Sequence, residues 1–266
     1  MRILVLLKQV PDMENVKFDR EKGRIDRTSA GTEINPFDLN ALEAAVRIKE
    51  KINSTVIALT MGPPNAEEVL KEAISRGADD GILLSDRKFG GADVKATSKT
   101  LAAAIKKVDK IDLIFAGIQT VDGDTGQVGP EIAEYLNIPH VSNVEDIKDF
   151  TEDHIDVVSN IFEGIYIKRA KYPALITVTK DVNVPRLPSF KNKMAARKAI
   201  ITKWGYEDIK DIISEDEIGS KGSATKVKKI EVPPIPSRIG RVFRDSNEKA
   251  VTEIIKVCEK MKVLEV

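Results

Sequence analysis

The sequence predicts an α/β protein with a doubly wound, mostly parallel sheet, an extended C-terminal arm and a terminal helix. Short apolar runs without polar alternation recur in the first half of the chain, as is typical of strands covered on both faces. Segments with helical spacing of apolar residues lie between them, and such alternation builds right-handed βαβ units. We therefore expect residues up to about Pro139 to form the sheet and its covering helices.

The elements follow from the patterning in order. Buried parallel strands are predicted at 3–7, 55–59, 81–84 and 113–116. Helices are predicted where apolar stripes recur, within 39–46, 66–74, 94–108 and 128–136. Residues 16–26 are polar with Lys22-Gly23 at their centre, which predicts a hairpin inserted after the first strand.

The pattern changes after Pro139. Segments 155–158, 165–168 and 174–178 are predicted as strands that extend the sheet without intervening helices. Prolines at 185, 188, 233, 234 and 236, with the low-complexity stretch 219–224, favour an extended arm over a second core. The predicted division is therefore an α/β domain of residues 1–183 and an arm of residues 184–266.

A single helix is expected to close the chain. Asp245 and Glu248 have the spacing of a capping box. The apolar stripe that follows consists of Val251, Ile254, Ile255, Cys258 and Met261.

Composition excludes several classes of function. Lys and Arg total 42, as do Asp and Glu, so no overall field attracts nucleic acid. The single cysteine, Cys258, excludes an internal disulfide and a cysteine-rich metal site, and it fits a cytoplasmic protein. The apolar start is too short for a signal peptide or a membrane span, so no membrane insertion is expected.

The candidate site lies in the loops that leave the carboxyl ends of the strands, where open α/β sheets bind ligands. The most informative loop is 117–127, a glycine-spaced turn between a predicted strand and a predicted helix. A helix start offers free N–H groups to a phosphate, and glycines allow close approach. The alternative is that Asp122, Asp124 or Thr125 caps the helix while the glycines form a tight turn. The loop matches neither a P-loop nor the G-x-G-x-x-G fingerprint.

Other candidates are less specific. Asn35-Pro36-Phe37-Asp38 precedes the first helix, where Asp38 has the character of an N-cap. His140 and His154 have no nucleophile motif beside them, so both are expected to be structural. No catalytic residues and no metal site are predicted, which leaves any chemistry to a cofactor.

Several segments, taken in order, resemble one family. They are Lys8-Gln9-Val10-Pro11-Asp12, Asn35-Pro36-Phe37 before Glu43-Ala44-Ala45, Met61-Gly62-Pro63, Arg76-Gly77-Ala78-Asp79, Asp122 to Gln127, Pro173-Ala174-Leu175-Ile176-Thr177 and Pro185-Arg186. Over nearly its whole length the chain resembles the beta subunit of electron-transfer flavoproteins. The resemblance implies an adenine-nucleotide alpha-hydrolase-like fold, a larger alpha subunit as partner, and an arm that embraces that subunit.

The resemblance also implies a cofactor. Housekeeping members hold AMP in the sheet crevice, whereas electron-bifurcating members hold a second FAD there, and the segment 121–130 looks like the bifurcating form. The implied contacts are Leu6, Lys8, Asn35, Asp38, Ala58, Met61, Asp93, Thr97, Gln119, Thr120, Val121, Asp122, Gly123, Asp124, Thr125, Gly126 and Gln127. FAD in this site would accept a hydride from NADH and pass one electron to ferredoxin and one to the alpha-subunit FAD.

The position of the partner-recognition loop is occupied by residues 185–194. The implied docking residues are Leu187, Phe190, Lys191 and Met194, with Phe190 as the apolar centre of a basic rim. They would bind an acyl-CoA dehydrogenase or a similar flavin dehydrogenase. The alternative is a Phe190 packed within the arm itself.

Three other functions stay open at this point. One is the AMP-containing carrier between acyl-CoA dehydrogenases and a quinone reductase. Another is a stand-alone adenine-nucleotide-binding module. The third is a nicotinamide dehydrogenase that acts alone, without an alpha subunit.

Overall fold

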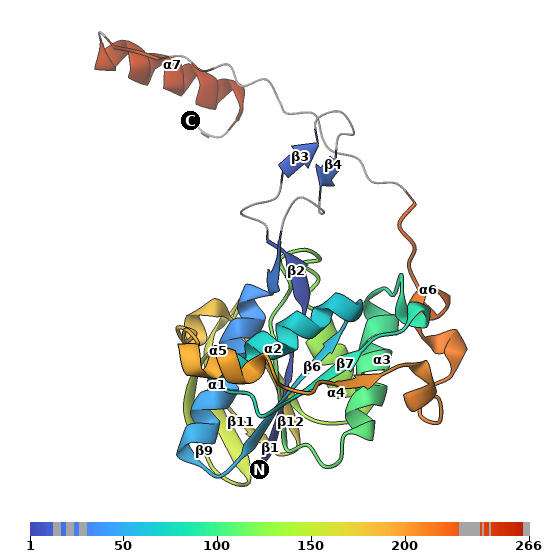
Figure 1. Cartoon of the computed structure of the whole chain (residues 1–266). Coiled ribbons are helices and arrows are strands. Elements are labelled where there is room, and N and C mark those ends of the chain that lie inside the picture. The colour runs from blue at the N-terminus through green and yellow to red at the C-terminus, as the bar shows by residue number, and fades with distance from the viewer. Residues whose placement is uncertain are drawn as a thin grey trace. The chain divides into compact units, whose positions relative to one another are not determined.

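The computed structural model describes residues 1–12, 17–19, 24–26, 31–228, 240, 242–244 and 246–262. Its main body is a nine-stranded sheet with helices on both faces (Figure 1). Contacts divide the chain into two units, Met1–Lys228 and Lys229–Val266. The predicted α/β, doubly wound fold is therefore confirmed, and the unit boundary lies later than the predicted division at residue 183.

Six neighbouring strands of the sheet are parallel. They are β1 (Arg2–Leu6), β6 (Thr55–Met61), β7 (Asp80–Leu84), β8 (Leu113–Gly117), β12 (Ala174–Val178) and β13 (Thr202–Trp204), in the order β12-β8-β1-β6-β7-β13. The chain moves outward from β1 through β6 and β7, then returns to β8 on the other side of β1. The strand order therefore reverses between β1 and β8, and their carboxyl ends flank the switch point.

Alternate residues of each strand face opposite layers of helices. The helices are α1 (Pro36–Lys51), α2 (Glu67–Arg76), α3 (Val94–Lys107) and α4 (Val128–Leu136). Val5 packs in one core with Ala45 of α1 and Leu70 of α2. Leu4 packs in the other core with Leu101 of α3. Both faces of the five parallel strands other than the edge strand β13 are thus covered, which explains why their sequences lack polar alternation.

Three longer strands continue the sheet on one side, in the order β11-β10-β9-β12. They are β9 (His140–Phe150), β10 (His154–Ile161) and β11 (Gly164–Lys171). β9 is parallel to β12, whereas β10 is antiparallel to both β9 and β11. The predicted strands at 155–158 and 165–168 lie in β10 and β11, but β9 was not predicted. Its second half is polar, with Glu145, Asp146, Lys148 and Asp149, because much of this strand is not buried.

Two small sheets accompany the main one. β2 (Gln9–Pro11) pairs antiparallel with β5 (Thr32–Ile34). β3 (Lys17–Asp19) pairs antiparallel with β4 (Arg24–Asp26), which confirms the predicted polar hairpin. The centre of that hairpin, Lys22-Gly23, lies outside the described residues.

Residues 184–228 contribute more to the main body than their proline content predicted. They include α5 (Phe190–Ala196), β13 at the sheet edge and α6 (Gly219–Gly222). Ile209, Ile213 and Ile218 are buried in the core beside α3. The signal was weak because these isoleucines are isolated among charged residues. Short 3-10 turns occupy Pro64–Ala66, Arg87–Phe89, Lys180–Val182, Tyr206–Asp208 and Glu215–Glu217.

The second unit contains α7 (Asn247–Lys260), the predicted terminal helix. Its N-cap is Ser246, whose side chain accepts a hydrogen bond from the Lys249 N–H, whereas the expected cap Asp245 lies outside the described residues. Val251, Ile254 and Ile255 are exposed within this unit. Among the described residues, no helix has the length and apolar character needed to cross a bilayer.

Candidate functional site

The carboxyl ends of β1 and β8 are joined by one buried carboxylate. Asp38 Oδ2 accepts a hydrogen bond from the Lys8 N–H (2.8 Å), and Oδ1 accepts one from the Gly117 N–H (3.1 Å). The prediction of Asp38 as an N-cap was wrong, because α1 begins at Pro36 with Asn35 in the N-cap position. Proline fits the first helical position, where no N–H is needed, and this places Asp38 in the first turn.

Burial dominates the electrostatics of Asp38. Loss of solvent raises the pKa of Asp38 to about 7, although hydrogen bonds from Asn35, Lys8 N and Gly117 N act in the opposite direction. Both carboxylate oxygens accept from protein donors, so Asp38 holds the two strand ends together. The direct contact with the cofactor that the family resemblance implies for Asp38 stays a prediction.

Gly117, at the end of β8, was not among the predicted site residues. A Cβ at this position would lie 2.6 Å from Phe37 Cβ and would also overlap the carboxylate of Asp38. The close approach of α1 to β8 therefore requires glycine here. A glycine that ends a buried strand was the available signal, but its partner, the Asn35-Pro36-Phe37-Asp38 turn, is distant in sequence.

Asn35 fixes the loop that follows β8. Its side chain is fully buried. Nδ2 donates to the Gln119 carbonyl at 2.8 Å, and Oδ1 accepts from the Val121 N–H at 3.2 Å. The predicted residues Asn35, Gln119 and Val121 are thus brought together, with Asn35 satisfying one acceptor and one donor of the loop backbone.

An ion pair closes the switch point. Lys8 Nζ lies 2.7 Å from Oδ1 and 2.8 Å from Oδ2 of Asp122. Burial acts to raise the pKa of Asp122, but the hydrogen bond and charge of Lys8 outweigh it and hold that pKa below its ordinary value. The loop after β1 and the loop after β8 therefore meet through side chains as well as through Asp38.

The loop 118–127 leads into α4 without a side-chain cap. Asp124 and Gly126 have positive φ angles of 56° and 67°, and Gln127 occupies the N-cap position. No side chain of the described residues caps this helix, so the alternative in which Asp122, Asp124 or Thr125 does so does not hold. Pro130 has no N–H and the Glu131 N–H donates to the Gln127 carbonyl, so the N–H groups of Val128 and Gly129, with the helix dipole, are the ones that could bind an anion. This arrangement fits the phosphates of a nucleotide.

The comparisons with known proteins agree with this architecture. Residues 22–209 match the family model described as the electron transfer flavoprotein domain. The chain belongs to the electron transfer flavoprotein family.

Similar proteins in this family include subunits of several complexes. The chain is 48% identical over 236 residues to the caffeyl-CoA reductase-Etf complex subunit CarD of Acetobacterium woodii, covering 88% of each chain. It is 43% identical over 271 residues to the electron transfer flavoprotein subunit beta of Megasphaera elsdenii, covering 98% of each. It is 40% identical over 260 residues to the acryloyl-CoA reductase electron transfer subunit gamma of Anaerotignum propionicum, covering 96% of this chain and 97% of that one. The predicted beta-subunit family and a role in electron transfer are therefore confirmed.

The other residues expected to contact the cofactor in this flavoprotein chain lie at the ends of strands, within strands or at the start of α3. Met61 ends β6 and Leu6, which is buried, ends β1, whereas Ala58 is buried within β6. Asp93 caps α3 by accepting from Ala96 N at 3.0 Å, and its other oxygen accepts from the N–H of Thr225 at 2.8 Å. Its carboxylate is therefore engaged within the protein.

Thr97 and the two histidines have separate surroundings. Thr97 lies in the first turns of α3 and is half-buried. His154 Nδ1 lies 3.0 Å from Thr151 Oγ1 in the turn before β10. His140 is exposed at the start of β9. The structure brings neither histidine to the switch point.

The expected docking residues of this family member are exposed. The side chains of Leu187 and Phe190 are 87% and 81% accessible, and Met194 is also exposed. α5 begins at Phe190 and is capped by Ser189 Oγ, which accepts from Asn192 N. Phe190 is therefore not packed into the described part of the arm, as the alternative required. Exposed cationic residues lie near it in sequence, namely Lys191, Lys193, Arg197 and Lys198.

Proposed function

We propose that this chain is the beta subunit of an electron-bifurcating electron transfer flavoprotein and holds FAD at the switch point between β1 and β8. The observation that carries the proposal is the uncapped start of α4 behind the loop 118–127. When bound there, FAD would accept a hydride from NADH and pass one electron to ferredoxin and one to the alpha-subunit FAD. The chain's own residues would bind and orient the cofactor.

The proposed roles follow from the contacts. Backbone N–H groups at the start of α4 would bind the phosphates. Asn35 and Asp38 would keep the loops after β1 and β8 in place. Lys8, already paired with Asp122, would add positive charge beside the phosphates. The exposed residues Gly123, Asp124 and Thr125 would meet the polar groups of the cofactor.

FAD is favoured over AMP by the sequence of the loop. Residues Val121-Asp122-Gly123-Asp124-Thr125-Gly126-Gln127 look like the bifurcating form of the family. The AMP-containing housekeeping carrier is the competing function, and the two differ in cofactor stoichiometry. NADH oxidation belongs to the FAD form only, and only within the heterodimer.

Cofactor analysis of the heterodimer tests this proposal. The chain is co-expressed with its alpha subunit, the complex is denatured, and the released nucleotides are separated and counted. We expect two FAD molecules per heterodimer and no AMP. One FAD with one AMP would contradict bifurcation and support the housekeeping carrier. A complex without any nucleotide bound by the beta subunit would contradict both.

The partners proposed are the alpha subunit, ferredoxin and a flavin dehydrogenase acting on acyl-CoA or a similar substrate. Two relatives carry acyl-CoA reductases in their names, caffeyl-CoA reductase and acryloyl-CoA reductase, which supports a partner of that class. The dehydrogenase would dock on Leu187, Phe190, Lys191 and Met194. An exposed apolar residue with exposed cations near it in sequence has the composition of an interface centre with a steering rim.

We also propose that the C-terminal part embraces the alpha subunit in the cytoplasm. The exposed side chains of Val251, Ile254 and Ile255 on α7 support this, because an amphipathic helix of this kind buries its apolar face against a partner. Ile254→Lys is expected to weaken co-purification of the alpha subunit, whereas Lys249→Ala serves as the control on the same helix. Equal recovery with both variants would contradict the role of α7.

A further inference from the structure

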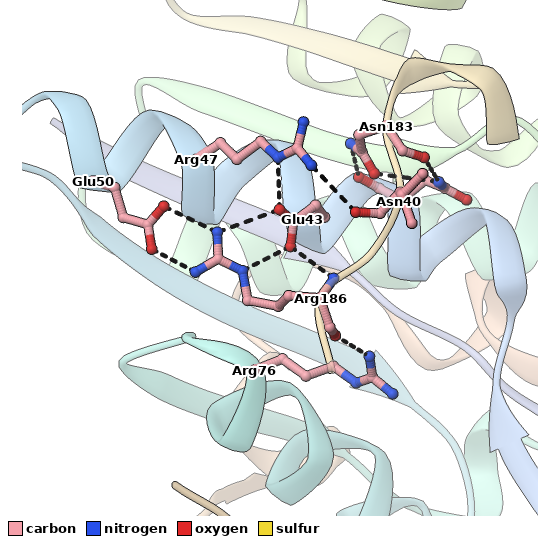
Figure 2. Close-up of polar contacts among 8 residues, drawn as sticks. Asn40, Glu43, Arg47, Glu50, Arg76, Asn183 and Arg186 are labelled. Carbon is pink, nitrogen blue, oxygen red and sulfur yellow. Dashed lines mark hydrogen bonds and ion pairs between the residues drawn. The ribbon is translucent and has the colours of Figure 1, made fainter. Parts of the chain in front are cut away.

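The segment that leaves β12 is fixed to α1 and α2 by a group of charged and amide side chains (Figure 2). At its centre is Arg186. Its backbone N–H and its Nε both donate to Glu43 Oε2, at 3.1 and 2.8 Å. Its guanidinium also binds both carboxylate oxygens of Glu50. Two residues about two turns apart on α1 are thereby held by one arginine from a segment more than a hundred positions away in sequence.

The backbone of the same segment is held by other side chains of these helices. Asn40 Nδ2 donates to the Asn183 carbonyl at 2.8 Å, and Asn183 Nδ2 donates back to the Asn40 carbonyl at 2.9 Å. Arg47 donates to the Val184 carbonyl at 3.2 Å. The chain from Asn183 to Arg186, just before the exposed docking residues, is therefore held on α1 (Figure 2).

The carboxylate at the centre is buried. Glu43 is only 4% exposed, and it accepts from Arg47 Nε at 2.6 Å in addition to Arg186. Burial acts to raise the pKa of Glu43, but the hydrogen bonds of Arg186 and Arg47 outweigh it, so the pKa stays below its ordinary value. Glu43 is thus an anion that depends on these two arginines. Without Arg186, the buried Glu43 carboxylate would keep only Arg47 of these two partners.

In the chain, Arg186 directly precedes the exposed docking residues. The Arg186 carbonyl accepts from Arg76 at 2.6 Å, which fixes the chain to α2 as well. The next residue, Leu187, is exposed, and the helix α5 that carries Phe190 packs against α2. The exposed side chains are therefore presented from a base that is held on two helices.

The other end of α1 holds the candidate cofactor loops. Asn35 and Asp38, at its start, bind the backbone of residues 8, 117, 119 and 121. A helix rises 1.5 Å per residue, so Glu43 and Glu50 lie about 8 and 18 Å along the axis from Asp38. One continuous helix thus connects the base of the docking segment with the switch point.

We propose that Arg186 is a positioning residue that fixes the docking segment to α1, so that a dehydrogenase bound to that segment is held in one place on the beta subunit, where the alpha-subunit FAD can pass electrons to it. The inference rests on the proposed function, because it requires both the cofactor at the switch point and the partner at Leu187 and Phe190. It adds a role for Arg186, Glu43 and Glu50, none of which is among the residues expected to contact the cofactor or to dock the partner.

The test uses the heterodimer with its full-length beta subunit and an acyl-CoA reductase with which the wild type gives saturable turnover. The variants are Arg186→Gln, which removes the charge, and Arg186→Lys, which keeps it without the planar fork. Arg169→Gln is the matched control. Arg169 forms a bidentate ion pair with Asp156 on β10, at 2.7 and 2.6 Å, so the same kind of contact is removed elsewhere in the chain. Phe190→Ala tests the docking surface itself.

We expect Arg186→Gln to retain the wild-type cofactor content but to lower kcat at saturating partner about 10-fold or more, because small misplacements of reacting centres cost large factors in rate. The kcat of Arg186→Lys should lie between those of the wild type and Arg186→Gln. The kcat of Arg169→Gln should match that of the wild type. Phe190→Ala should raise KM for the partner while leaving kcat closer to that of the wild type.

Three outcomes would overturn the inference. One is an unchanged kcat in Arg186→Gln. Another is loss of cofactor in proportion to the loss of turnover, which would mean that Arg186 only stabilises the fold. If Phe190→Ala changes neither constant, the docking surface itself is misassigned, and the failure then belongs to the proposed function. A normal cofactor content with an effect of Phe190→Ala but none of Arg186→Gln isolates the failure to Arg186.

Discussion

Lys8 and Asp122 form an ion pair across the point where the strand order of the sheet reverses, with Nζ within 2.8 Å of both carboxylate oxygens. The two residues follow β1 and β8, which are adjacent strands although 114 positions separate the pair in sequence. The ion pair keeps the anionic Asp122 neutralised in the place where the phosphates are expected. Its removal gives the first prediction.

Lys8→Met should weaken retention of the cofactor. The half-buried carboxylate of Asp122 would then repel a phosphate, and Lys8 itself would no longer attract one. Because Lys8 is partly exposed, we expect a modest loss of about 10-fold in affinity, or about 1.4 kcal/mol. Equilibrium dialysis of the heterodimer measures it. The control is Lys71→Met, whose ion pair with Glu67 lies on α2. Equal affinity of the two variants would contradict the prediction.

Asn35→Asp should loosen the loop 118–127. The substitution keeps an acceptor for Val121 N but replaces the donor to the Gln119 carbonyl with an oxygen. A buried carbonyl without its donor costs about 1–3 kcal/mol, and urea unfolding should show a loss of that size. Hydrogen exchange should rise in residues 118–127. Asn65→Asp, at an exposed site, is the control. Unchanged exchange in the loop would show that Asn35 does not hold it.

Gly117→Ala should destabilise the protein through a steric clash. The added Cβ would lie 2.6 Å from Phe37 Cβ, so α1 must move away from β8 or the strand end must shift. Overpacking of this kind typically costs about 1–3 kcal/mol. Gly31→Ala is the matched control, because no atom of the residues that the structure describes lies within 4 Å of the added Cβ. Thermal unfolding compares them, and similar Tm values would refute the close approach of Phe37.

Asp38 should make stability depend on pH. Its pKa in the folded chain is about 7, above the ordinary 3.8, so the folded state binds this proton more tightly than the unfolded state. The corresponding stabilisation is complete below about pH 4 and is lost as the pH rises through about 7. The difference in unfolding free energy between wild type and Asp38→Asn should therefore fall over this range, by at most about 1.4 kcal/mol per pH unit.

Urea unfolding of both proteins at half-unit steps of pH measures this difference. Other titrating groups contribute equally to both proteins and cancel in the subtraction. A difference that stays constant between pH 4 and 7 would mean that Asp38 titrates at its ordinary pKa. A difference that grows with pH would mean that its carboxylate is stabilised, as hydrogen bonds from Lys8 and Gly117 alone would do.

Sequence patterning predicted the parallel strands and their helices because residues covered on both sides are apolar throughout. β9 and β13 escaped prediction for opposite reasons. β9 is long but only partly buried, so its charged residues interrupt the apolar pattern by which a strand is predicted. β13 has only three residues and is a strand only through its pairing with β7. Neither strand has a local signal comparable with that of β1.

The candidate site was predicted in its location more than in its contacts. The glycine spacing of 117–127 and the carboxyl-end rule indicated the loops. The partners of Asn35, Asp38 and Lys8 are 84, 79 and 114 residues away, respectively, and no local pattern identifies such pairs. The same holds for Arg186 and Glu43, which are 143 residues apart in sequence.

The position of β13 has a consequence for the segment between it and β12. These strands lie on opposite sides of the parallel region, five strand intervals apart, or about 24 Å at 4.8 Å per interval. Residues 179–201 are therefore a strap tethered at both ends to one rigid sheet. A partner that binds the middle of this segment has little conformational entropy of the chain to remove. Binding there therefore costs less free energy than binding a tail that is free at one end.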